Sequence, residues 1–178
     1  MIYGNKEMER SAIFGAAKLM VAAARTAPKA RGIDNIETLI LDGGDKDALA
    51  AEMRKLADET GVPIFTRDAG NVDHSEYVVL IGVKNIPNAL KNCGLCGFEN
   101  CAETVRAGAN CTFNITDLGI ALGSAAAIAA DNRIDNRIMW TVGKAARRLL
   151  LMPERVEVCY GIPLSTAGKS IYYDRTPV

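Results

Sequence analysis

The stretch Tyr77-Val78-Val79-Leu80-Ile81-Gly82-Val83 is a short apolar run that predicts a strand buried in a sheet. Residues 36–41 (IETLIL) alternate and then become apolar, which predicts a second strand on the N-terminal side. Residues 156–162 (VEVCYGI) predict another strand. Residues 63–67 are a short strand candidate, followed by a polar loop over residues 68–75. Together these runs predict a β-sheet.

Helical patterns lie on both sides of these strands in the sequence. Residues 7–27 carry apolar side chains on one stripe at helical spacing, and Pro28 ends that helix because it disfavours helical geometry in the residue before it. Asp45 is placed to cap a helix over residues 46–60, and Gly61 is placed to end it. The alternation of helices and strands predicts a layered α/β or α+β architecture.

The C-terminal half continues this pattern after a cysteine-rich segment. Two helices are predicted over residues 117–130 and 138–151, and the first is too short to span a membrane comfortably. Residues 168–178 are expected to form a surface tail or to wrap around a partner. The length suggests a single α+β domain over residues 1–178, with residues 92–112 as an inserted segment.

Composition excludes several classes of function. Lys plus Arg and Asp plus Glu number 21 each, so the net charge is zero and a nucleic-acid partner is not expected. No long apolar run is free of charges and the N-terminus is too polar for a signal peptide, so we expect a cytoplasmic protein without membrane spans. A reducing compartment disfavours disulfides, and clustered cysteines there more often hold a metal.

The five cysteines are unevenly distributed. Four form the pattern C-x2-C-x4-C-x9-C, at Cys93, Cys96, Cys101 and Cys111. Four thiolates suffice for a [4Fe–4S] cluster, and the nearby glycines allow the tight backbone that such a site needs. A four-cysteine structural zinc site and free thiols remain alternatives. We expect Cys159 to be buried in its strand, and the single histidine, His74, to face solvent.

The run Cys93-Gly94-Leu95-Cys96-Gly97-Phe98-Glu99-Asn100-Cys101 resembles the four-cysteine module of the Rnf complex B subunit and of the corrinoid iron–sulfur protein's large subunit. In those families the last gap is longer and a proline usually follows the fourth cysteine, whereas Thr112 follows Cys111 here. The resemblance implies a cluster site with Cys111 as its least typical ligand and Cys159 as the substitute.

The flanking segments resemble a different family. Ala22-Ala23-Ala24-Arg25-Thr26-Ala27-Pro28 and the segment from Val156 to Pro163 resemble flavin-dependent nitroreductases, and the whole chain is similar to a group described as ferredoxin-domain proteins of anaerobes. This implies a nitroreductase-like α+β fold, with a mixed sheet flanked by helices, and a homodimer. The Arg-Arg-Ser run that helps hold the FMN phosphate in that family is missing, and Lys29 replaces its serine. Arg25 and Lys169 are the candidates for an FMN phosphate.

Three functions follow from these features. The first is an iron–sulfur protein that transfers single electrons with a redox partner protein or a small electron donor. The second is an FMN-dependent, nitroreductase-like oxidoreductase that uses the cluster as an electron relay. The third is a non-enzymatic module with a structural zinc site. The sequence names no catalytic residue.

Overall fold

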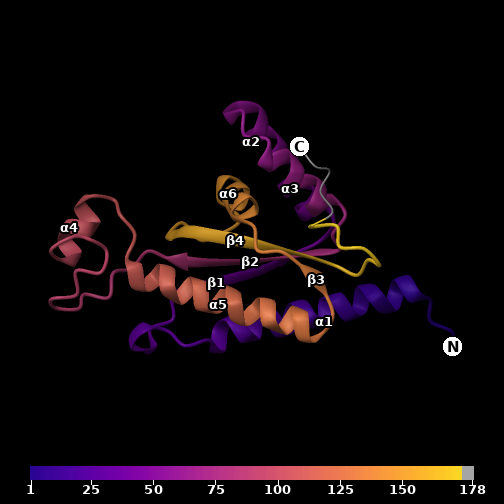
Figure 1. Cartoon of the computed structure of the whole chain (residues 1–178), viewed down its shortest axis with the longest axis horizontal. Helices are drawn as coiled ribbons and strands as arrows, with labels where there is room; N and C mark the ends of the chain where they lie inside the picture. The colour runs from indigo at the N-terminus through magenta and orange to yellow at the C-terminus, as the bar shows by residue number, and fades with distance from the viewer. Residues whose placement is uncertain (174–178) are drawn as a thin grey trace.

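The computed structural model describes residues 1–173 and contains one four-stranded antiparallel sheet between two layers of helices (Figure 1). The strand order is β1-β2-β4-β3. The strands are β1 (Ile36–Leu41), β2 (Tyr77–Lys84), β3 (Asp135–Asn136) and β4 (Val156–Ser165). The predicted α+β class with a helix-flanked sheet is confirmed, but every strand pair is antiparallel, whereas a mixed sheet was expected.

Strand β2 lies between β1 and β4 and is buried over residues 77–83. Successive side chains of a strand point to opposite faces, and the two cores reflect this period. Val79 and Ile81 belong to the core on one face, whereas Val78 and Leu80 belong to the core on the other face. An apolar run without alternation is therefore needed, because both faces are covered by helices.

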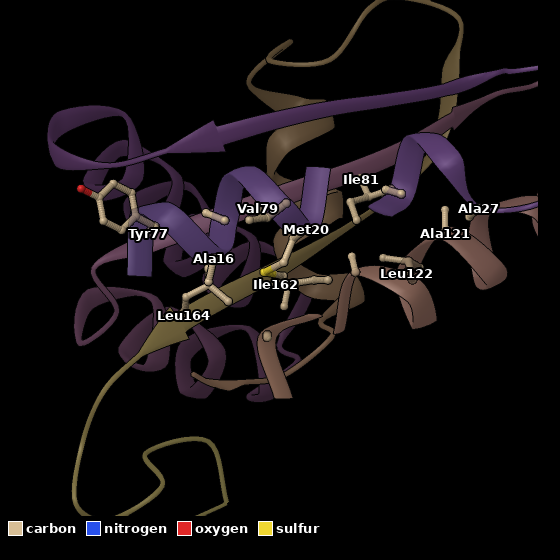
Figure 2. Close-up of a cluster of buried hydrophobic side chains, with 14 of the residues drawn as sticks. Ala16, Met20, Ala27, Tyr77, Val79, Ile81, Ala121, Leu122, Ile162 and Leu164 are labelled. Carbon is tan, nitrogen blue, oxygen red and sulfur yellow. The ribbon is translucent and has the colours of Figure 1, made fainter. Parts of the chain in front are cut away.

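Helices α1 (Asn5–Thr26) and α5 (Thr112–Asp131) cover one face of the sheet. Figure 2 shows Ala16 and Met20 of α1 beside β2 and β4, with Ala121 and Leu122 of α5 in the same cluster. Small side chains on both helices allow close packing. Helix α5 is longer than predicted. Among residues 1–173 it is the one helix long and apolar enough to cross a bilayer, by length and composition only, with a mean hydropathy of 1.4.

Helices α2 (Gly43–Thr60), α3 (Ile64–Asp73) and α6 (Trp140–Arg148) cover the other face (Figure 1). Gly143 lets α6 approach β4 closely, since a Cβ there would lie 1.7 Å from the carbonyl oxygen of Cys159. Tyr172 is fully buried in the same core, and its hydroxyl lies 2.8 Å from the Ser75 hydroxyl. Burial raises the pKa of Tyr172 to about 12.

Four local predictions differ from the structure. Residues 63–67 form no strand and residues 68–75 no loop, because α3 occupies most of this stretch. Helix α2 begins at Gly43, so Asp42 rather than Asp45 is its N-cap residue. Up to residue 173, the expected surface tail folds back onto its own chain through Tyr172, while the last five of its residues lie outside the described range.

Two short elements complete the fold. The 3-10 helix η1 (Ala30–Gly32) follows α1, and α4 (Cys101–Arg106) lies between β2 and α5. The segment that carries α4, residues 85–111, extends beyond the layers at one end of the molecule, at the left of Figure 1. Arg31 of η1 holds this segment by donating a hydrogen bond to the carbonyl oxygen of Asn88.

Candidate metal centre

The four predicted ligands line one pocket in segment 85–111, although they come from three different local structures. Cys93 and Cys96 lie in the loop, Cys101 is the first residue of α4, and Cys111 is the N-cap residue of α5. The structure therefore brings together all four cysteines of the sequence pattern. Cys111, the ligand with the least typical spacing, is also the most buried of the four.

The loop around the first two cysteines turns tightly. Gly94 and Gly97 both have positive φ, at 59° and 83°, which a side chain at either position would strain. The Gly97 N–H donates to the Gly94 carbonyl oxygen at 2.9 Å and closes the turn. Cys93 and Cys96 lie in and beside this turn, and both line the pocket.

Helix α4 positions the third cysteine. The Asn100 side chain accepts a hydrogen bond from the Glu103 N–H at 3.1 Å, so Asn100 caps the N-terminus of α4. One turn further, Thr104 is 1% exposed and its hydroxyl lies 3.1 Å from the Cys96 sulfur. The Thr104 hydroxyl and then the Phe98 N–H hold the pKa of the Cys96 thiol below its usual value, because both hydrogen-bond to the sulfur.

Two asparagines attach the fourth cysteine to the sheet. The Asn85 side chain donates to the Ala109 carbonyl oxygen and accepts from the Cys111 N–H, both at 3.1 Å. Asn114, in the first turn of α5, donates to the carbonyl oxygens of Lys84 and Ile86. The end of β2 thus fixes the backbone on both sides of Cys111. Sequence reasoning missed Thr104, Asn85 and Asn114, since their partners are distant in sequence or depend on the helix register.

The rest of the pocket wall is mainly apolar. It includes five large apolar residues, namely Pro87, Leu90, Leu95, Phe98 and Phe113. The room for water-sized molecules is about 20 Å³, roughly enough for one water molecule. Within residues 1–173, no three Cys, His, Asp or Glu side chains are arranged to hold a metal ion as they stand.

The donor set nevertheless fits a thiolate-bound metal group. Four cysteines without competing carboxylate or imidazole groups line the pocket, which is the ligand set of [4Fe–4S] clusters and of structural zinc. No three of these cysteines are placed to hold a metal ion as they stand, so binding such a group requires the loop around Cys93 to adjust. Leu95 in that loop is 62% exposed, so a shift of this turn would disturb little packing.

The remaining cysteine and the histidine lie elsewhere. Cys159 is buried in β4 as predicted, and burial raises the pKa of its thiol to about 12. It lines a separate surface pocket beside Trp140 and Gly143, so it does not substitute for Cys111 in this arrangement. His74 is exposed as predicted, with Nδ1 2.7 Å from the Gly70 carbonyl oxygen.

The two predicted phosphate ligands are not brought together within one chain. Arg25 lies in the last turn of α1 and donates to Asp34 at 2.5 Å and to the Ile36 carbonyl oxygen at 2.8 Å. Lys169 is exposed and closely follows Ala167, which lies beside the first turns of the same helix. At 1.5 Å per residue, the two ends of α1 are roughly 30 Å apart.

Lys29 has a structural role in this chain. Its side chain is 5% exposed, and Nζ donates to the carbonyl oxygens of Ala24, Arg25 and Ala27 at 2.6–2.9 Å. These are carbonyls at the C-terminal end of α1, where a cation is favoured by the helix dipole. Lys29 therefore caps the C-terminal end of α1.

The fold is that of the nitroreductases. A protein described as a nitroreductase in complex with FMN, from Desulfovibrio desulfuricans, has a TM-score of 0.60 at 15% identity, covering 92% of this chain and 80% of that one. The FMN-dependent nitroreductase NfnB from Mycobacterium smegmatis has a TM-score of 0.58 at 11% identity, covering 93% and 84%. At this identity the likeness shows the fold alone.

Sequence relatives define the family more narrowly. Residues 107–175 match the family described as uncharacterized protein containing a ferredoxin domain (DUF2148), a range that includes Cys111 and begins after Cys101. A protein from Archaeoglobus fulgidus, described only as uncharacterized, is 42% identical over 185 residues and covers 99% of both chains. This chain belongs to the same family as the Archaeoglobus fulgidus protein, and its C-terminal part matches the ferredoxin-domain family.

Proposed function

We propose that this protein holds a [4Fe–4S] cluster through Cys93, Cys96, Cys101 and Cys111 and transfers single electrons. The observation that carries the proposal is that these four cysteines, spread over three local structures, line one pocket. The match to a family described as containing a ferredoxin domain supports a redox role. The four-cysteine module resembling that of the Rnf complex is part of the same proposal.

The chain's own groups would bind and shield the cluster. Four thiolates would supply the ligands, the Thr104 hydroxyl would donate a hydrogen bond to one sulfur, and the Leu95 and Phe98 side chains would limit access of water. The cluster itself supplies one-electron chemistry at a potential set by these surroundings. Residues 92–112 form an inserted binding segment in a single domain, and the electron partner is a redox protein or a small donor in the cytoplasm.

Reductive titration tests this function. Protein purified without oxygen and reconstituted with iron and sulfide is expected to take up about one electron per chain, with loss of its brown colour. Apoprotein is the control and should consume none. A colourless protein that binds zinc and accepts no electron would contradict the proposal and favour the structural zinc site.

The fold favours a second candidate, an FMN-dependent reductase with the cluster as relay, because the neighbours of Desulfovibrio and Mycobacterium bind or depend on FMN. Within one chain the cations Arg25 and Lys169 lie at opposite ends of α1, which weighs against a shared phosphate site. Anaerobic reconstitution with FMN followed by denaturation and identification of released flavin decides it. No retained flavin would eliminate this candidate.

A homodimer is part of the proposal. Helices α1 and α5 lie side by side, and each leaves large apolar side chains exposed to solvent, among them Phe14, Leu19 and Ile120. A partner chain that covered these side chains would bury apolar surface that water now contacts. Light scattering after size exclusion is expected to give about twice the 19.1 kDa mass of one chain. A monomeric mass at micromolar concentration would contradict the dimer.

A further inference from the structure

The hydroxyl of Thr104 is confined to the wall of the cysteine pocket. It lies 3.1 Å from the Cys96 sulfur and 3.3 Å from the Asn100 carbonyl oxygen, and the residue is 1% exposed. At this burial, bulk solvent does not compete with either partner. The single hydroxyl hydrogen can point toward only one of the two at a time.

The direction of that hydrogen depends on the state of the Cys96 sulfur. A free thiol can donate its own hydrogen to the Thr104 oxygen, and the hydroxyl can then donate to the Asn100 carbonyl, as serine and threonine often do within a helix. A metal-bound sulfur has lost its proton and only accepts. The hydroxyl hydrogen must then turn to the sulfur, or the sulfur is left without this donor.

Rotation of the hydroxyl hydrogen toward the sulfur leaves no buried group without a hydrogen-bond partner. The Asn100 carbonyl oxygen also accepts the Thr104 N–H at 3.2 Å, so it keeps a partner when the hydroxyl turns away. Losing the 3.3 Å contact from the hydroxyl to the Asn100 carbonyl oxygen therefore costs little. The hydrogen bond gained by the negatively charged Cys96 sulfur is worth more, since charge-assisted hydrogen bonds are the stronger class. The Thr104 hydroxyl can therefore serve as a donor to the Cys96 sulfur.

We propose that Thr104 is a positioning residue that donates its hydroxyl hydrogen to the metal-bound sulfur of Cys96 and thereby raises the cluster's reduction potential. This inference rests on the proposed function. Adding one electron increases the negative charge on the sulfurs, so a donor to sulfur stabilises the reduced form more than the oxidised form. Removing the donor shifts the potential to more negative values.

The test compares four reconstituted proteins by electrochemical titration. Thr104→Val keeps the shape of the side chain and removes the hydroxyl, and Thr104→Ser restores it. A hydrogen bond to a charged group supports an expected tenfold loss in the equilibrium constant for reduction of Thr104→Val, which is about 59 mV for one electron. Thr104→Ser is expected to stay near the wild-type potential.

Thr141→Val is the matched control for a purely structural effect. Thr141 is also fully buried and donates its hydroxyl to Asp68 at 2.6 Å, but it lies in α6 on the second core. Its replacement should lower stability and leave the potential unchanged. Equal potentials for wild type and Thr104→Val would overturn the role of Thr104 while leaving the iron–sulfur function standing.

A parallel measurement with Zn²⁺ separates the two claims further. If wild-type protein takes up no iron but binds Zn²⁺, the proposed function fails, and a tenfold lower Zn²⁺ affinity of Thr104→Val still supports the sulfur donor. An unchanged Zn²⁺ affinity of Thr104→Val overturns the role of Thr104 as a donor to sulfur. A wild-type protein that binds neither metal overturns both the function and the role of Thr104.

Discussion

Replacing Cys93, Cys96 or Cys101 with alanine is expected to reduce the iron content from about four atoms per chain to a small fraction of that value. Each substitution removes one of four thiolates, and no further cysteine, histidine or carboxylate among residues 1–173 lines the pocket to replace it as a metal ligand. Loss of a partner around metal ligands already costs 10–100-fold in affinity, and loss of a ligand costs more. Iron and sulfide analysis of protein purified without oxygen measures the effect.

Cys111 and Cys159 make the sharpest comparison within this prediction. Both are buried, but Cys111 lines the pocket and Cys159 lies in β4 beside Trp140. Cys111→Ala should therefore lose iron like the other three variants, whereas Cys159→Ala should retain it. Loss of iron from Cys159→Ala but not from Cys111→Ala would identify Cys159 as the fourth ligand and contradict the four-cysteine pocket.

Gly143→Ala is expected to destabilise the fold by about 3 kcal/mol or more, because overpacking of a rigid site costs 1–3 kcal/mol and sometimes more. The added Cβ would lie 1.7 Å from the Cys159 carbonyl oxygen and 2.7 Å from the Tyr160 nitrogen. These are backbone atoms of β4, which is paired on one side with β2 and cannot retreat. For a chain of this size the melting temperature should fall by roughly 6–12 °C.

Gly70→Ala is the matched control for this substitution. Gly70 also lies within a helix on the same side of the sheet, and a Cβ there would have no atom within 4 Å. Because alanine favours helix over glycine by about 1 kcal/mol, this variant should be as stable as wild type or more so. Equal destabilisation of both variants in denaturant unfolding would mean that α6 does not pack on β4 as described.

Local patterns were sufficient to predict β1, β2 and β4 and most helices, but not the two-residue strand β3. The run at residues 77–83 forms β2 because both of its faces are covered, and Gly61 ends α2 with a φ of 69°. Helix α3 was missed because Pro63, Asp68 and Asn71 are typical of loops. Its apolar residues Phe65, Ala69 and Val72 nevertheless follow helical spacing.

The helical spacing of α3 was overlooked because one of its buried residues, Asp68, is polar. Asp68 is 3% exposed because the hydroxyl of Thr141, distant in sequence, donates to one carboxylate oxygen while Arg67 contacts the other. The same limit applies to the pocket. Cysteine spacing was enough to predict a set of thiols that line one pocket, but Thr104 and Asn85 gain their roles from partners that only the folded chain brings into contact.

The metal and sulfide content of anaerobically purified protein tests the central claim most directly. We predict about four iron atoms and four acid-labile sulfides per chain, in a brown protein that loses them when Cys96 is replaced. Stoichiometric zinc without iron or sulfide, or a protein that retains neither metal after reconstitution, would contradict the assignment of the four-cysteine pocket as an iron–sulfur site.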